Sequence, residues 1–335
     1  MTVWLTLFFA MGAIGTWLAR AYALQRHLLD HPGERRSHGV ATPRGGGISI
    51  VLVLLVATLA LAVRDPARGV LLVGFAAGLL LVAGIGWWDD HRPLPAWLRL
   101  AVHAIAAAML AMVVFSAYGE TWLAIAAFVA ALVLTNVWNF MDGINGLAAS
   151  QAVLVAAGYA TAALSGGVWG WLGWALVAGC LGFMPFNFPR ARIFLGDVGS
   201  GALGFAIAAL AVAAVAEDTM AWPLALVPLS AVMIDAGLTL GRRLLRGERW
   251  WTAHAQHAYQ GWARRVGSHV PVMLGYAAWT AVGLMLVAGL VSDAGFFLTL
   301  VAVLAWYTSG TFLWWRLQRR DAGNRQADQV EWHKE

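Results

Sequence analysis

Long apolar runs recur along the whole chain, and each approaches the ~20 residues that cross a ~30 Å hydrocarbon core as a helix. Backbone that faces lipid must satisfy its hydrogen bonds within the segment, so these runs are expected to be helices. The sequence therefore predicts an all-α, polytopic membrane bundle of about eleven transmembrane helices. The expected spans are 3–24, 45–63, 69–88, 97–117, 121–138, 148–165, 168–185, 200–216, 222–241, 272–291 and 295–316.

Composition supports one membrane domain with no soluble domain attached. Mean hydropathy is +0.70 and 12% of the 335 residues are charged, whereas about a quarter are charged in soluble domains. The longest polar connection is 242–271. We expect a single integral-membrane domain over 1–320 and a polar cytosolic tail over 321–335. The single cysteine, Cys180, excludes a disulfide framework within the chain.

The placement of Lys and Arg predicts the orientation of the bundle. Most basic residues lie in the connections after odd-numbered spans and in the C-terminal tail, while the opposite side carries only Arg64 and Arg68. The positive-inside bias puts the N-terminus outside and the C-terminus in the cytosol.

This asymmetry accounts for the net charge of +5 without a nucleic-acid partner. An anionic substrate at the cytosolic face is a second use for it. No basic region precedes the first apolar run, so a cleaved signal peptide is not expected.

The reactive residues gather in connections on the predicted cytosolic side. These connections read RRSHGVATPRGGG (35–47), WWDDHRPLP (87–95), NFMDGINGL (139–147), FNFPRARIFLGDVGSG (186–201) and ERWWTAHAQHAYQ (248–260). The outer connections are short and contain no histidine. Five such loops on one side predict a composite site at a membrane surface.

Asp89 and Asp90 directly follow an apolar span. They could be acids that merely flank a helix end. Carboxylates beside Trp87 and Trp88 at membrane depth nevertheless require a positive neighbour, and adjacent carboxylates raise each other's proton affinity. A divalent cation or a proton-accepting role would relieve that free-energy cost.

Asp197 lies in the glycine-rich turn IFLGDVGSG. Gly196 and Gly199 let the backbone approach a ligand closely. Because the next span begins near Ser200, the amides of this turn could seat a phosphate at a helix N-terminus. The alternative is a structural turn in which the aspartate caps the helix.

Asn136, Asn139 and Asp142 recur every third residue, with Asn145 beyond them. This spacing puts the first three on one broad face of a helix end. Amides inside bundles also form interhelical hydrogen bonds, which is the structural alternative. At the mouth of a bundle the same groups suit a metal, a phosphate or a nucleobase, and hard oxygen ligands favour Mg²⁺ or Mn²⁺ over zinc.

His254 and His257 lie three residues apart in a basic loop. No third ligand of zinc-site spacing accompanies them, so phosphate contact is the favoured interpretation and a solvated basic loop the alternative.

Asp235, inside the ninth expected span, should have a partner. Together these loops suit phosphoryl transfer, in which positioning and charge neutralisation supply most of the catalysis. The apolar bundle beneath suggests a lipid phosphate as one substrate.

The motifs SHGVATPRGGG, DD at 89–90, NVWNFMDGINGLA, FLGDVGSGALGF and AHAQHAYQ occur in an order that resembles the polyprenyl-phosphate N-acetylhexosamine-1-phosphate transferases. The resemblance covers residues 35–260. It implies transfer of a sugar-1-phosphate from a UDP-N-acetylhexosamine to undecaprenyl phosphate, with Mg²⁺ (or Mn²⁺) as cofactor and UMP as product. It also implies a bacterial inner-membrane enzyme with a cytosolic active site.

The resemblance also implies roles for particular residues. Asp197 would be the main metal ligand and Asn139 a second. Asp89 and Asp90 would form the acidic pair that deprotonates or positions the lipid phosphate. The nucleotide- and substrate-binding residues would be Arg44, Asn136, Asp142, Asn145, Gly196, Gly199, Ser200, His254 and His257.

Two departures from the family pattern bear on function. Asn145 stands where many bacterial members have a carboxylate, and HAQH replaces an adjacent histidine pair. The second feature favours the initiators of O-antigen (lipopolysaccharide) or other surface polysaccharides, with the cell-wall enzymes as relatives. Two other functions stay open at this stage: an ion-coupled secondary transporter of an anionic substrate, and an inactive relative with Asn145 as the lesion. A homodimer also stays open.

Overall fold

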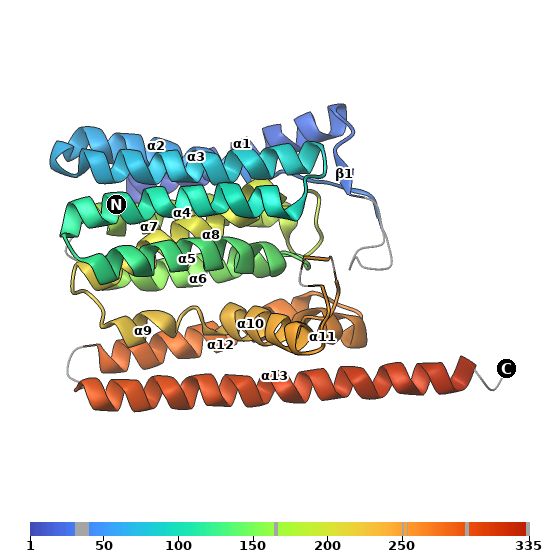
Figure 1. The fold of residues 1–335 in the computed structure, drawn as a ribbon. Coiled ribbons are helices and arrows are strands. Elements are labelled where there is room, and N and C mark those ends of the chain that lie inside the picture. The colour runs from blue at the N-terminus through green and yellow to red at the C-terminus, as the bar shows by residue number, and fades with distance from the viewer. Residues whose placement is uncertain (31–39, 164–166, 250, 253, 292–294, 333–335) are drawn as a thin grey trace.

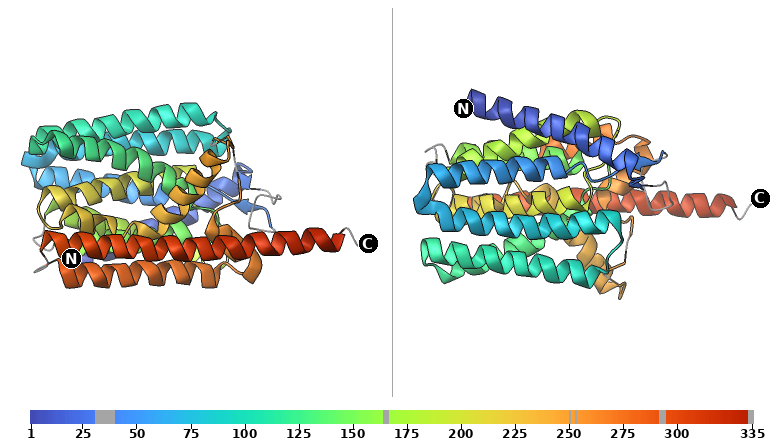
Figure 2. Two further views of the ribbon diagram at one scale, coloured as in Figure 1. Left: turned by 60° about the horizontal axis from the view of Figure 1, so that its bottom comes forward. Right: turned by 90° about the horizontal axis from the view of Figure 1, so that it is seen from above.

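The computed structural model describes residues 1–30, 40–163, 167–249, 251–252, 254–291 and 295–332, and it is an all-α bundle. The helices are α1 (Thr2–Gln25), α2 (Ile48–Arg64), the short η1 (Pro66–Arg68), α3 (Gly69–His91), α4 (Ala96–Tyr118), α5 (Thr121–Phe140), α6 (Leu147–Ala162), α7 (Val168–Asn187), α8 (Asp197–Ala216), α9 (Trp222–Leu226), α10 (Ser230–Leu245), α11 (Ala258–Val266), α12 (Val270–Leu290) and α13 (Phe296–Trp332). Two short strands, β1 (Leu29–Asp30) and β2 (Thr42–Pro43), pair antiparallel. The long helices lie side by side across the view of Figure 1 and again in both views of Figure 2, and α13 projects beyond them toward the C-terminus.

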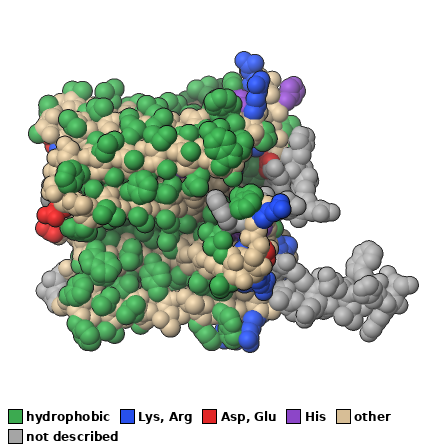
Figure 3. All heavy atoms as spheres, viewed as in Figure 1, with side chains coloured by type: hydrophobic (Ala, Val, Ile, Leu, Met, Phe, Trp, Pro, Cys, Tyr) green, Lys and Arg blue, Asp and Glu red, His purple; other side chains and the backbone are tan. Residues whose placement is uncertain are grey.

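The predicted membrane character is confirmed. Within the described part of the chain, eight helices have the length and apolarity to cross a membrane, and the apolar helices α2 and α6 are shorter. Their bounds follow the expected spans closely: 69–88 is observed as Gly69–His91, for example. Hydrophobic side chains cover the flank seen in Figure 3, and Lys and Arg gather toward one end. The count of eleven and the orientation stay predictions, and the turn at 165–167 lies mostly outside the described residues.

The expected span 222–241 is not one helix. α9 ends at Leu226 and α10 begins at Ser230, with Pro228 between them. Proline has no amide hydrogen and its ring clashes with the preceding helical turn, so a continuous helix breaks here. A hydropathy window merges the two pieces because proline changes the average little.

The centre of the bundle is α8. In its most apolar stretch 94% of the residues are buried, against 17% in that of α13. Small residues make this possible, because helices meet closely where side chains are short. A Cβ added at Gly204 would lie 2.1 Å from the carbonyl oxygen of Leu134 on α5. Asp197, the first residue of α8, is therefore held by the most deeply buried of the long apolar helices.

Backbone hydrogen bonds join two of the motifs recognised in the sequence. Phe194 N donates to Pro43 O at 2.8 Å, Gly46 N to Phe194 O at 2.9 Å and Gly47 N to Leu195 O at 2.8 Å. The PRGGG segment therefore lies alongside the turn that leads into Asp197. Ser37–Gly39 of the first motif, and the basic pair Arg35 and Arg36, lie outside the described residues.

Asp235 has the partners that an intramembrane acid requires. Its carboxylate, 1% exposed, accepts hydrogen bonds from the amides of Ala258 (2.8 Å) and Tyr259 (3.1 Å). It also accepts from the side chains of Tyr276 (2.6 Å) and Trp314 (3.2 Å) on α12 and α13. The start of α11 is thereby fixed to the bundle.

Candidate active site

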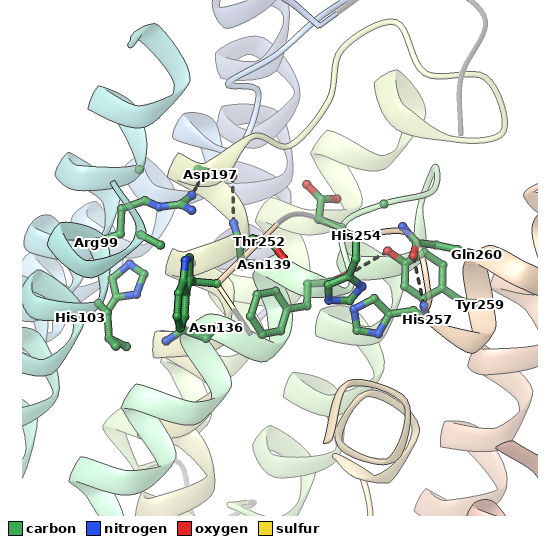
Figure 4. Close-up of a pocket in the computed structure, with 18 residues that line it drawn as sticks. Arg99, His103, Asn136, Asn139, Asp197, Thr252, His254, His257, Tyr259 and Gln260 are labelled. Atoms are coloured by element: carbon green, nitrogen blue, oxygen red, sulfur yellow. Dashed lines mark hydrogen bonds and ion pairs between the residues drawn. The ribbon is translucent and has the colours of Figure 1, made fainter. Parts of the chain in front are cut away.

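Two joined cavities lie at the end of the bundle where the polar loops meet. The larger, about 440 Å³, is bounded by α3, α4, α5, the start of α8 and residues 251–260. The smaller, about 270 Å³, is bounded by residues 187–197 and by Asp30, Arg44 and Asp90, among others. Asp142, Gly143, Asp197 and Gln260 line both. Figure 4 shows Arg99 and His103 on one side of the larger cavity and His254, His257 and Tyr259 on the other.

A chain of polar contacts connects the residues expected to catalyse. Arg99 Nη1 donates to Asp89 Oδ2 at 3.0 Å and to Asp197 Oδ2 at 2.7 Å. Asn139 Nδ2 donates to Asp197 Oδ1 at 2.9 Å and to Ser200 Oγ at 3.0 Å. Residues from α3, α4, α5 and α8 therefore meet at one carboxylate, as a composite site requires.

Asp90 has a different environment from Asp89. It is 2% exposed and accepts the backbone N–H groups of Asp197 and Val198, each at 3.1 Å. Arg44 Nε lies 3.9 Å away. Two of the α8 amides considered for a phosphate seat are therefore occupied by Asp90, and this carboxylate fixes the turn that carries Asp197.

Asn136, Asn139 and Asp142 all line the larger cavity. α5 ends at Phe140, so Asp142 lies in the turn after the helix. Burial, followed by the carboxylates of Asp197 and Asp90, raises the pKa of Asp142 well above its ordinary value. A cation in this region would lower that pKa again.

Three other expected substrate contacts are engaged within the protein. Asn145 Nδ2 donates to Pro189 O at 3.1 Å, a bond that a carboxylate could not make. Gly199 packs against Gly47, where an added Cβ would lie 2.6 Å from Gly47 Cα. Ser200 is fully buried. Asn145 lines the smaller cavity, while Gly199 and Ser200 line neither.

The two histidines of the 251–260 loop lie side by side. The ring centroids of His254 and His257 are 4.9 Å apart, and both rings line the larger cavity. His257 is 4% exposed and immediately precedes α11. Burial, then His257 and Arg243, lowers the pKa of His254 to about 4, so His254 is neutral at pH 7. It can exchange hydrogen bonds with a ligand but does not supply charge.

This lowered pKa makes a prediction for stability. An unfolded histidine binds a proton below about pH 6.5, whereas folded His254 does so only near pH 4. Unfolding therefore takes up a proton between these values, and stability should fall as the pH drops from 7 to 5. His254→Gln should lose less thermal stability over that range than the parent, measured by tryptophan fluorescence in detergent. Equal losses in both proteins would contradict the assignment.

Sequence reasoning missed several residues that line or join the cavities: Arg99, His103, Phe194, Tyr259, Gln260 and His269. Two of these carried a readable signal. Arg99 and His103 are polar residues within the apolar span 97–117, and ionisable groups inside spans mark functional sites.

The oxygen-rich cluster suits a hard divalent cation. Among the described residues in and beside the two cavities, the carboxyl groups of Asp30, Asp89, Asp90, Asp142 and Asp197 outnumber the guanidinium groups of Arg44 and Arg99. Among the residues described, no three His, Cys, Asp or Glu side chains converge closely enough to bind a metal by themselves. Mg²⁺ does not need such a cage, since it is commonly held by one or two carboxylates together with substrate phosphates and water. Asp197 provides such a carboxylate, and the side-chain amide of Asn139 contacts it.

Sequence comparison adds an independent observation. Residues 72–215 match the profile of glycosyl transferase family 4. The chain is 34% identical over 265 residues to a phospho-N-acetylmuramoyl-pentapeptide-transferase of Moorella thermoacetica, covering 69% of this chain and 80% of that protein. It is 29% identical over 246 residues to a probable undecaprenyl-phosphate N-acetylglucosaminyl 1-phosphate transferase of Bacillus subtilis, covering 69% and 68%. It is 28% identical over 331 residues to a decaprenyl-phosphate N-acetylglucosaminephosphotransferase of Mycobacterium leprae, covering 84% and 80%.

Proposed function

The chain belongs to glycosyl transferase family 4, among the polyprenyl-phosphate N-acetylhexosamine-1-phosphate transferases, and we propose that it transfers a sugar-1-phosphate from a UDP-N-acetylhexosamine to undecaprenyl phosphate. The proposed products are UMP and a lipid-linked sugar that starts a surface polysaccharide such as O-antigen. We place the enzyme in a bacterial inner membrane with its site facing the cytosol.

The observation that carries the proposal is the convergence on Asp197. Asp89 and Asn139 are linked to it through side-chain contacts, and Asp90 binds the amide of the same residue. These residues come from three helices that meet at the junction of two cavities. A diphosphate placed there would reach oxygen ligands and guanidinium groups together.

Mg²⁺ is the proposed cofactor, with Asp197 and Asn139 as its protein ligands. When bound, the metal would neutralise charge on the donor diphosphate in a site partly screened from water. Arg44, which lines the smaller cavity, and Arg99, which lines the larger one, would supply further positive charge.

The smaller cavity suits the nucleotide. It offers the ring of Phe194, the carboxyl of Asp142 and the amide of Asn145, with Arg44 beside them. An aromatic face and amide groups recognise a pyrimidine ring, and an arginine recognises phosphate. Its volume of about 270 Å³ limits it to part of the donor. The sugar would then extend into the larger cavity toward His254 and His257.

The reaction is a displacement at the sugar-bearing phosphorus. An oxygen of the lipid phosphate forms a new bond to that phosphorus, the bond from the phosphorus to the bridging oxygen breaks, and UMP leaves with the bridging oxygen. A phosphate monoester has its second pKa at about 6, so its oxygen is already largely deprotonated at neutral pH. Asp89 and Asp90 are then needed to position Arg99 and the α8 turn rather than to remove a proton.

A reconstitution assay tests the proposal. Purified full-length protein with Mg²⁺ and undecaprenyl phosphate is given a panel of UDP-N-acetylhexosamines, and UMP release and the mass of the lipid product are measured. We expect one donor to give a product heavier than the acceptor by a sugar-phosphate. Uptake of substrate into vesicles without UMP would instead indicate a transporter. Absence of turnover with every donor would indicate the inactive relative.

A further inference from the structure

The last long helix, α13, carries a buried glutamine, although most of the described part of this helix is exposed. Gln318 is 9% exposed, whereas the next two residues, Arg319 and Arg320, are exposed. α13 packs against α10 and α11, which lie beside it in Figure 1. Buried polar side chains are nearly always hydrogen-bonded, so the partners of Gln318 indicate what it does.

Gln318 joins α13 both to α10 and to the loop 251–260 that carries the two histidines. Its Oε1 accepts a hydrogen bond from Arg242 Nη1 at 3.0 Å, and its Nε2 donates to the carbonyl oxygen of Gln256 at 2.8 Å. Gln256 lies between His254 and His257 in the sequence, and both histidines line the larger cavity. A side chain of the last helix therefore contacts the backbone of the histidine loop directly.

One turn earlier on α13, Trp314 is linked to the same loop through Asp235. Residues four apart share one face of a helix, so Trp314 and Gln318 lie side by side. Trp314 Nε1 donates to Asp235 Oδ1 at 3.2 Å, and the same oxygen accepts the amide of Ala258 at 2.8 Å. The guanidinium of Arg242 lies over the Trp314 ring, 5.6 Å from its centroid. Both α13 side chains are thus connected to the loop and to one arginine of α10.

These contacts hold the two peptide groups that flank His257. The carbonyl of Gln256 belongs to the peptide group before His257, and the amide of Ala258 belongs to the one after it. Peptide groups are planar, and only φ and ψ turn between them, so fixing both groups also fixes the direction of the Cα–Cβ bond of His257. This side chain is 4% exposed and lies beside His254 at the larger cavity (Figure 4).

We propose that Gln318 is a positioning residue for His257: by holding the Gln256 carbonyl, it sets how the His257 ring enters the larger cavity. This inference rests on the proposed function, in which the histidine loop meets the sugar of the donor. Gln318 itself lines neither cavity, so it acts on the donor only through the loop.

Two substitutions separate this role from simple attachment of α13 to α10. Gln318→Glu keeps an oxygen for Arg242, but a carboxylate cannot donate to the Gln256 carbonyl. Gln318→Met removes both bonds at similar volume. Loss of a buried hydrogen bond should lower kcat/KM for the UDP-sugar by about fivefold or more in both variants, while the KM for polyprenyl phosphate stays near the parental value. Parental donor kinetics in Gln318→Glu would show that attachment to α10 is sufficient, and the inference would be wrong.

A double-mutant cycle with His257→Gln distinguishes positioning from a general loss of structure. Once His257 has been replaced, Gln318→Glu should lower kcat/KM for the donor no further, because effects that pass through one residue are not additive. The same fold loss with and without His257 would overturn the inference. Thr311→Val, at an exposed position of the same helix, is the matched control and should leave the donor kinetics unchanged.

Hydrogen exchange separates this inference from the proposed reaction. Amide exchange over residues 254–260 would be measured by mass spectrometry on the full-length protein in detergent, without substrate. Both Gln318 variants should exchange about threefold faster or more in this segment, and Thr311→Val should match the parent. Unchanged exchange in the Gln318 variants would overturn the inference, as would faster exchange with parental donor kinetics. If the parent releases no UMP with any donor, the proposed function fails, and the exchange measurement still decides whether Gln318 holds the loop.

Discussion

Asp197→Asn is expected to lower UMP release by about 10³-fold or more, because it removes the charge on which the cation, Arg99 and Asn139 converge. Asparagine has nearly the same shape and keeps one carbonyl oxygen to accept from Asn139 or Arg99. The protein should therefore still fold, with a thermal unfolding midpoint near that of the parent. Binding of Mn²⁺, followed by its paramagnetic resonance signal, should weaken in parallel with activity.

Asp218→Asn is the matched control for this substitution. Asp218 is exposed at the end of the bundle opposite the cavities, beyond α8, so activity and Mn²⁺ binding should not change. If Asp197→Asn retained activity close to that of the parent, or bound Mn²⁺ equally well, the metal assignment would be wrong.

Gly86→Ala is expected to cause the second large loss, through geometry rather than charge. A Cβ at position 86 would lie 2.4 Å from the carbonyl oxygen of Asp197 and 2.6 Å from the nitrogen of Val198. Backbone atoms cannot rotate away, so α3 and the start of α8 must separate. Overpacking of this kind costs about 1–3 kcal/mol, and misplacement of a catalytic group by about 1 Å can lower the rate about 10²-fold.

Gly84→Ala provides the comparison on the same helix. Gly84 is exposed, and a Cβ there would meet nothing within 4 Å. Alanine at this position should leave both activity and the thermal midpoint unchanged or slightly raise the midpoint, because alanine favours helix. Similar losses for both variants would show that the close approach of α3 to Asp197 does not control the site.

Hydropathy predicts most of the helices because an apolar run that faces lipid must satisfy its backbone hydrogen bonds internally, which a helix does. It does not reveal the break between α9 and α10, since Pro228 lies in a stretch that is apolar on both sides. The polar loops occupy alternate connections between the spans. The sequence therefore predicted that they meet at one end of the bundle. It also predicted that Asp197, Asn139 and the paired histidines lie together, and all of them line the larger cavity.

Other parts of the site depend on contacts that no local pattern encodes. Asp89 and Asp90 differ in their contacts: Asp90 accepts from the first amides of α8, whereas Asp89 accepts from the amide of Leu94. The contacts of Arg99 with Asp89 and Asp197 depend on the face of α4 that turns toward the site. A basic residue in an apolar span indicates a functional site. Only the three-dimensional structure shows which residues it contacts.

The contacts of Asp235 have a consequence for biosynthesis of the protein. Apart from Thr239, the groups that donate to this carboxylate come from Ala258, Tyr259, Tyr276 and Trp314, all later in the chain. While the ribosome is still translating those segments, α10 carries an acid that lacks most of its compensation, which is costly in or near lipid. We therefore expect the start of α11 to be fixed to the bundle only after α12 and α13 have been inserted, later than the helices that precede α10.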